Sequence, residues 1–211
     1  MNNIIISYLT MRKAIGFLAL VFPFALIFGK MLGGVLPMEV SISAYYWTTA
    51  GDIFVSLLAV IGIFLISYKG YDLRDKIITS IAGVSMLLVA LFPCFGTDSP
   101  NYIFMFLSPK ATGIIHYAAA ILTFSFMGVM SFFQFTKGNS GTEGKKKRNK
   151  VYKICGIVIG STILIMLITI LFPSLRKATD TFRLFFWLES IVVWAFGISW
   201  LIKGETLLKD K

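Results

Sequence analysis

Hydrophobic residues in this chain are gathered into six long runs that carry almost no charge and are separated by shorter polar segments. Each run is close to the roughly 20 apolar residues that a helix needs to cross a hydrocarbon core of about 30 Å. Backbone polar groups in lipid must be satisfied within the segment, and the runs lack the alternating pattern of barrel strands. The pattern therefore predicts an all-α, polytopic membrane protein, a six-transmembrane-helix bundle that forms one domain over residues 1–211. The predicted spans are residues 14–28, 53–68, 77–93, 113–135, 154–173 and 184–202.

The composition agrees with a chain that lives in a membrane. Hydrophobic residues make up 57% of the sequence, charged residues make up 14%, and the mean hydropathy is +0.82. A soluble domain has about 25% charged residues. We expect membrane lipids to be its first partners.

Lysine and arginine are spread unevenly over the segments between the runs, and this sets the expected orientation. Cytoplasmic loops carry an excess of these residues. With the N-terminus inside, only five of the 20 basic residues fall outside, namely Lys30, Lys110, Arg176, Lys177 and Arg183. Both termini are therefore expected to be cytoplasmic, and much of the net charge of +10 is a topology signal.

The segment TKGNSGTEGKKKRNK, residues 136–150, is rich in Gly, Ser and Lys. Such a composition predicts a flexible connector between a front part of four spans and a back part of two. Its basic run can also attract anionic lipid headgroups. No nucleic-acid role is expected, because the run lacks an aromatic or motif context.

Three ionisable residues fall within or at the mouth of the predicted spans: Asp52, His116 and Glu189. Such residues are costly in a membrane and usually face the bundle interior. The expected topology places all three in the outer half of the membrane. This coincidence predicts an outward-facing polar pocket. Ser56 would lie one turn below Asp52, and the pocket would be rimmed by Tyr45, Tyr46 and Trp47.

Each of these residues also has a simpler interpretation. Asp52 directly follows a glycine and can serve as a helix N-cap or first-turn acid. His116 can bond to a neighbouring helix, and Glu189 can pair with Arg183 or Lys110. One histidine with two acids is a poor catalytic metal set, so neither a metal nor another cofactor is expected.

Several short motifs in the sequence together resemble those of a known protein family. They are SxSxYYWTxxGDxFV over residues 41–55, SYKGYD over 67–72, the isolated His116, WLE over 187–189 and FGISWLIKGE over 196–205. Together they resemble a bacterial family of uncharacterised six-span membrane proteins. More distantly, the layout is similar to the Frag/DRAM/Sfk superfamily, whose members are linked to lipid and GPI-anchor remodelling or lipid distribution. This second likeness is one of architecture. The resemblance implies a location in a bacterial inner or plasma membrane.

Three functions are consistent with the sequence. In the first, the outer pocket binds a lipid headgroup or a small amphiphilic ligand. In the second, the same residues catalyse acid–base chemistry on a lipid or envelope substrate, with His116 as the base. In the third, the polar residues only hold helices together. The first two require Asp52, His116 and Glu189 to share one cavity.

Overall fold

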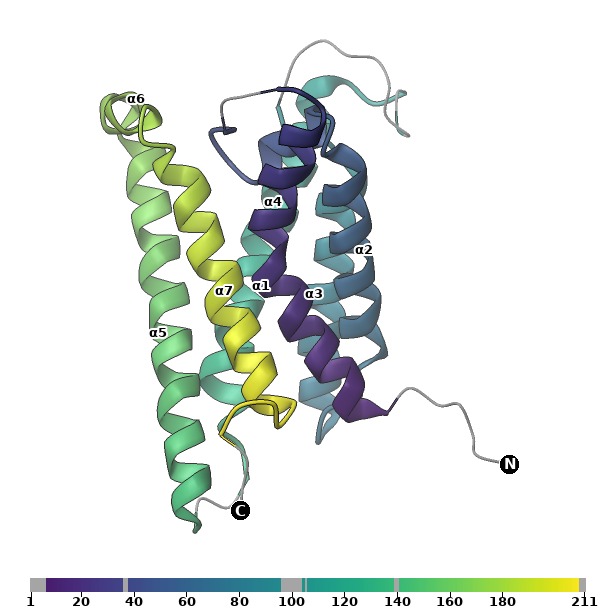
Figure 1. Cartoon of the computed structure of the whole chain (residues 1–211), viewed down its shortest axis with the longest axis vertical. Helices are drawn as coiled ribbons and strands as arrows, with labels where there is room; N and C mark the ends of the chain where they lie inside the picture. The colour runs from purple at the N-terminus through teal and green to yellow at the C-terminus, as the bar shows by residue number, and fades with distance from the viewer. Residues whose placement is uncertain (1–6, 36–37, 96–103, 105, 139–140, 209–211) are drawn as a thin grey trace.

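The computed structural model describes residues 7–35, 38–95, 104, 106–138 and 141–208, and this part of the chain is helical and without strands (Figure 1). Three short helices accompany the long ones: the 3₁₀-helix η1 (Ser43–Trp47), the π-helix η2 (Met130–Gln134), which continues α4, and α6 (Pro173–Asp180). The long helices are α1 (Tyr8–Leu32), α2 (Gly51–Ser67), α3 (Leu73–Leu91), α4 (Pro109–Val129), α5 (Glu143–Leu171) and α7 (Leu184–Lys203).

The predicted all-α class is confirmed, and each of the six apolar runs falls mainly on one long helix. Four helices are long and apolar enough to cross a membrane: α1, α4 together with η2, α5 and α7. The apolar helix α2 is shorter, with 17 residues. The described chain thus has the helices of a membrane protein.

The six long helices form a closed ring. Along the chain α1 packs on α2, α2 on α3, α3 on α4 and α4 on α5, and then α5 packs on α7, which returns to α1 (Figure 1). Helix α1 begins and α7 ends at one end of the bundle, which we call the terminal end. Helix α6 lies at the opposite end, the α6 end.

Glycines allow two pairs of helices in the ring to approach backbone to backbone. A Cβ added to Gly83 would lie 2.5 Å from the carbonyl oxygen of Gly62, and one added to Gly62 would lie 2.9 Å from that of Gly83. Gly16 and Gly197 meet in the same way between α1 and α7. Small residues at such contacts are typical of helix packing in membranes, where close approach supplies van der Waals contact.

The outer surface of the ring is apolar. Large side chains such as Phe17, Phe28, Ile121 and Leu164 are 62%, 61%, 64% and 57% exposed. Soluble monomers rarely expose so much contiguous apolar surface. In lipid these side chains have a favourable solvent.

Residues 136–150 are expected to form a flexible connector. This prediction is wrong for residues 143–150, which form the first two turns of α5. Thr142 caps this helix, since its hydroxyl accepts the N–H of Lys145 at 3.2 Å. An ion pair of 2.7 Å between Lys146 and Glu143 supports the first turn. A good N-cap and helix-forming Glu and Lys residues outweigh the overall polarity of the segment.

Candidate functional site

Residues 40–47, which we call the capping segment, close the α6 end of the bundle. The N–H of Phe186 in α7 donates to the carbonyl oxygen of Val40 at 3.1 Å. Tyr45 in η1 is fully buried, with its ring 5.8 Å from that of Phe186. The segment is therefore part of the packed bundle rather than a loop lying over it.

Glu189 and His116 both bind this segment. Glu189 is 5% exposed, and its carboxylate accepts the N–H of Ile42. The Nε2 of His116 lies 3.0 Å from the hydroxyl of Ser43, and its Nδ1 lies 2.7 Å from the carbonyl oxygen of Phe92. A carbonyl oxygen only accepts, so Nδ1 carries the proton, and in the neutral ring Nε2 accepts the Ser43 hydroxyl. The two ionisable residues thus meet at adjacent positions of one segment and fix it in place.

Asp52 does not join them. It is exposed in the first turn of α2, whose N-cap residue is Ala50, and Ser56 is exposed one turn further along. The buried face of α2 carries Phe54 and Leu58, so positions 52 and 56 lie off that face. The predicted pocket of Asp52, His116 and Glu189 is therefore not formed, and Asp52 occupies the first-turn position that favours the helix dipole.

The aromatic residues expected to rim an open pocket instead hold the capping segment. Tyr45 belongs to the core. The indole N–H of Trp47 donates to the carbonyl oxygen of Cys94 at 3.2 Å, and Tyr46 packs edge-on against Trp47 and Phe54. These contacts are structural.

A narrow crevice lies beneath the capping segment, between α1, α2, α3, α4 and α7. Its volume is about 40 Å³, and its lining is apolar apart from Glu189, Ser43 and Thr123. Pockets for small ligands have about 300–1,000 Å³. The crevice is too small for a lipid headgroup.

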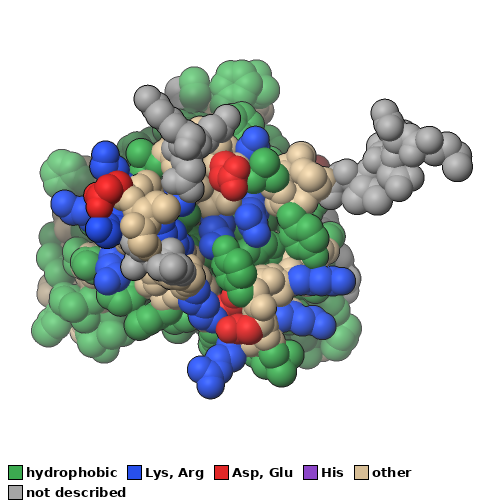
Figure 2. Space-filling view, turned by 90° about the horizontal axis from the view of Figure 1, so that it is seen from below, with side chains coloured by type: hydrophobic (Ala, Val, Ile, Leu, Met, Phe, Trp, Pro, Cys, Tyr) green, Lys and Arg blue, Asp and Glu red, His purple; other side chains and the backbone are tan. Residues whose placement is uncertain are grey.

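A much larger cavity, of about 460 Å³, lies at the terminal end. Its lining comes from α1, α5, α7 and the segments after α2 and η2, and we call it the basic cavity. Figure 2 shows Lys and Arg side chains gathered on this end of the molecule. Among the described lining residues, Glu205 is the only acid. The basic lining residues are Arg12, Lys137, Lys145, Arg148 and Lys203.

Lys203, the last residue of α7, is the most deeply placed of these cations. It is only 7% exposed. Its Nζ lies 3.1 Å from the hydroxyl of Tyr71, and 4.6 Å and 5.6 Å from the ring centres of Tyr71 and Phe135. The rings offer a favourable but uncharged environment for an ammonium group. No carboxylate of the described residues lies within ion-pair distance of Lys203.

Arg12 lies beside Lys203. Its guanidinium donates to the carbonyl oxygen of Lys203 at 3.4 Å and to the hydroxyl of Tyr68 at 3.3 Å. Its Nε is buried and donates no hydrogen bond to any described residue. Both accepting oxygens are uncharged, and among the described residues no carboxylate forms an ion pair with Arg12.

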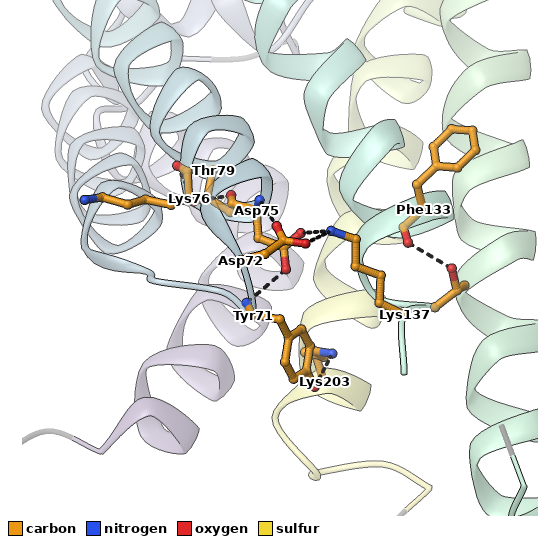
Figure 3. A network of polar contacts seen from close by, with 9 residues as sticks. Tyr71, Asp72, Asp75, Lys76, Thr79, Phe133, Lys137 and Lys203 are labelled. Carbon is orange, nitrogen blue, oxygen red and sulfur yellow. Dashed lines mark hydrogen bonds and ion pairs between the residues drawn. The ribbon is translucent and has the colours of Figure 1, made fainter. Parts of the chain in front are cut away.

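Lys137 is bound by two carboxylates. Its Nζ lies 2.9 Å from a carboxylate oxygen of Asp72 and 2.5 Å from one of Asp75, and Tyr71 and Lys203 lie next to this cluster (Figure 3). The N–H of Asp75, followed by the Lys137 ammonium, lowers the pKa of Asp72 below its ordinary value. Partial burial opposes the charged form of Lys137, but the hydrogen bonds to Asp75 and Asp72 outweigh it and raise the pKa of Lys137.

Sequence reasoning missed the basic cavity because its residues were interpreted as a sign of orientation and, for the run that contains Lys145 and Arg148, as a segment that can attract anionic lipid headgroups. They are far apart in the chain, and only the closure of α7 on α1 brings Lys203 to Arg12. One signal was present: Lys203 directly follows the apolar stretch SWLI at the end of the last span.

Comparison of the chain with family models, with characterised proteins and with solved structures finds no match. In the part of the chain that the structure describes, no group of three or more His, Cys, Asp or Glu side chains is arranged to hold a metal ion. Function therefore has to be inferred from the geometry of the two ends of the bundle.

Proposed function

We propose that this chain is a multi-pass protein of the cell membrane, with six spans and both termini in the cytoplasm, that binds the headgroup of an anionic lipid in the basic cavity. The observation that carries the proposal is the cavity itself, about 460 Å³ in volume and lined by five basic side chains and one acid among the described residues. Its size lies within the range of pockets for small ligands.

The expected orientation supports this assignment. The distribution of Lys and Arg favours a cytoplasmic location for the terminal end of the bundle. The cytoplasmic leaflet is negatively charged, and basic pockets between membrane helices on this side bind acidic headgroups. A lipid in that leaflet therefore has both proximity and favourable charge.

The site thus differs from the outward-facing pocket that the sequence predicts. At the α6 end, Glu189 and His116 bind the capping segment, Asp52 and Ser56 are exposed, and the crevice has a volume of about 40 Å³. This arrangement favours neither headgroup binding nor catalysis there. Lipid binding at the terminal end is consistent with the structure of both ends of the bundle.

Native mass spectrometry of the full chain, extracted with its lipids in a mild detergent, tests the proposal. The wild type should retain anionic lipids, and Arg12→Gln should retain about tenfold less, since one favourable charge contact is lost. Lys177→Gln removes an equal charge from the exposed surface of α6 and should bind like the wild type. Equal lipid retention by Arg12→Gln and Lys177→Gln would contradict the proposal.

The orientation has its own test. Single cysteines placed after residue 208 and within residues 173–180 can be labelled in intact cells with a thiol reagent that does not cross membranes. The proposal predicts labelling at α6 and none at the C-terminus. The reverse pattern would place the basic cavity outside the cell.

A further inference from the structure

We infer that the interior of the bundle conducts protons along one face of α4 and η2, between Glu189 at the α6 end and the basic cavity at the terminal end. This activity is additional to the proposed lipid binding and does not depend on it. Three features support it: unpartnered polar side chains on this face, the cavities that they line, and ionisable residues at both ends.

Three polar side chains on the buried face of α4 and η2 have an atom without a hydrogen-bond partner among the described residues. They are the hydroxyls of Thr123 and Ser131 and the amide oxygen of Gln134, and these residues are 4%, 0% and 8% exposed. A buried polar group without a partner costs free energy, and polar residues inside a membrane span are often functional. Water molecules that bridge these groups would satisfy them.

Buried hydroxyls elsewhere in the bundle form hydrogen bonds within their own helix. Thr169 in α5 and Ser190 in α7 each donate to a carbonyl oxygen one turn earlier, at 2.7 Å and 2.8 Å. This local bond satisfies Ser and Thr within a helix. The hydroxyls of Thr123 and Ser131 do not form it, so they remain available to hydrogen-bond in the bundle interior.

Cavities connect both ends of this row to ionisable residues. At the α6 end, Thr123 and Glu189 line the crevice beneath the capping segment. Towards the terminal end, Gln134 lines a smaller cavity, of about 10 Å³, together with Asp75 and Lys203. Lys203 also lines the basic cavity. Each end of the row therefore reaches a group that can bind and release a proton.

Ser131 lies between the crevice and the smaller cavity. The crevice extends along α4 to Met127, four residues before Ser131, and Gln134 follows three residues after it. At about 1.5 Å per residue, these steps rise about 6 Å and about 4.5 Å along the helix. A water molecule with two hydrogen bonds of about 2.8 Å spans about 5.6 Å. About one water on each side of Ser131 is therefore enough to join the two cavities along the helix axis.

The helix changes its geometry at this point. Ser131 and Gln134 belong to the π-helix η2, in which the N–H of Phe135 donates to the carbonyl oxygen of Met130 at 3.0 Å. Single π-turns within α-helices are rare and are frequently found at functional sites. The location of η2 at two of the three unpartnered residues supports a functional role for this face.

A proton crosses such a chain by exchange of hydrogen bonds. Glu189 takes up a proton when the capping segment opens locally, and it becomes a carboxylate again when the proton passes to a water beside Thr123. The hydroxyls of Thr123 and Ser131 each accept one proton and release another, and the Gln134 oxygen holds the next water as an acceptor. The proton leaves through water in the basic cavity. A difference in pH or voltage across the membrane drives the transfer, so no co-reactant is consumed.

The test measures proton flux into liposomes that contain the full chain and a trapped pH-sensitive dye, after a step in the external pH, with potassium and valinomycin to balance charge. We expect the wild type to equilibrate severalfold faster than liposomes without protein. Thr123→Val, Ser131→Ala and Glu189→Gln should each return the rate to that of protein-free liposomes. Thr169→Val removes a hydroxyl that bonds within its own helix, so it is the matched control for Thr123→Val and should keep the wild-type rate.

Two outcomes would overturn the inference. The first is a wild-type rate equal to that of protein-free liposomes, and this result would leave the proposed lipid binding standing. The second is an equal rate in the wild type, Thr123→Val and Ser131→Ala, because any flux would then cross the membrane elsewhere. Removing an unpartnered hydroxyl breaks no hydrogen bond to a described residue, so the melting temperature of Ser131→Ala should equal or exceed that of the wild type. Thr123→Val and Ser131→Ala therefore test the pathway even if Glu189→Gln does not fold.

Discussion

The Nζ of Lys137 lies 2.5 Å from Oδ1 of Asp75, and this contact joins the segment after η2 to the first turn of α3. Asp75 is 3% exposed, and its other oxygen accepts the N–H of Tyr71 at 2.9 Å. Lys137 also lines the basic cavity. One lysine is therefore shared between an internal ion pair and the proposed ligand site.

This sharing predicts that removing a carboxylate improves anion binding. Asp72→Asn takes one of the two carboxylates from Lys137, so its charge becomes more available to the cavity. Asparagine is as good an N-cap as aspartate, so α3 should keep its start. We expect the dissociation constant for an anionic lipid to fall severalfold in nanodiscs.

Glu143→Gln is the matched control. It also removes one carboxylate from an ion pair with a lysine, that of Lys146, on the exposed surface of α5. Its lipid affinity should equal that of the wild type. If Asp72→Asn bound the lipid more weakly than Glu143→Gln, this prediction would be contradicted. Lys137 would then need its ion pair with Asp72 to contribute to lipid binding.

The Asp72 carboxyl also predicts a dependence of stability on pH. Its pKa is lowered in the folded protein, so its contribution is fully present above the ordinary value of about 3.9 and is lost as the pH falls through the lowered pKa. Thermal unfolding in detergent between pH 5 and pH 2 should show a decline in the melting temperature that is smaller in Asp72→Asn. The same decline in both proteins would assign it to other carboxyls.

At the α6 end, the structure predicts different roles for two acids that the sequence grouped together. Glu189→Leu leaves the buried N–H of Ile42 without its acceptor and should destabilise the protein by about 1–3 kcal/mol. Glu189→Gln keeps an acceptor and should cost less. Asp52→Asn, on the exposed surface, should change the free energy of unfolding by less than about 0.5 kcal/mol. An equal cost for Asp52→Asn would show that Asp52 also has a buried role.

The contact between α2 and α3 predicts a strong effect of a single methyl group. Gly83→Ala places a Cβ 2.5 Å from the carbonyl oxygen of Gly62, so the helices must separate at a cost of about 1–3 kcal/mol. Gly160→Ala in α5 meets no atom within 4 Å and should leave stability unchanged or slightly improved. Thermal unfolding of the two variants checks the difference, and similar melting temperatures would contradict the close approach of α2 and α3 at these glycines.

Much of the fold could be predicted from the sequence because a lipid environment allows an apolar segment few backbone conformations other than a helix. Long apolar runs have few alternatives to helices in lipid, and all six appear as helices. The helical start of α5 was missed because it depends on one capping residue, Thr142, within a segment whose composition is typical of linkers. The short helix α6 was missed for a similar reason, since its eight residues lack an apolar run.

The site was harder to predict because it depends on tertiary contacts. The sequence predicts His116 and Glu189 as parts of an open pocket, whereas both bind the capping segment. Membrane depth also does not determine which face of α2 carries Asp52. The pairing of Arg12 with the end of α7 joins residues 191 positions apart, and no local pattern indicates it. Charge counting therefore gave an orientation and no cavity.

The most direct test of headgroup binding at the terminal end is an experimental structure of the full chain in nanodiscs that contain an anionic lipid. We predict density for a headgroup within the basic cavity, with its phosphate in contact with Arg12 and Lys203 and with Lys137 still bound to Asp75. A cavity filled by solvent or by the protein's own side chains, with the lipid bound only at the α6 end or on the outer surface, would contradict this prediction.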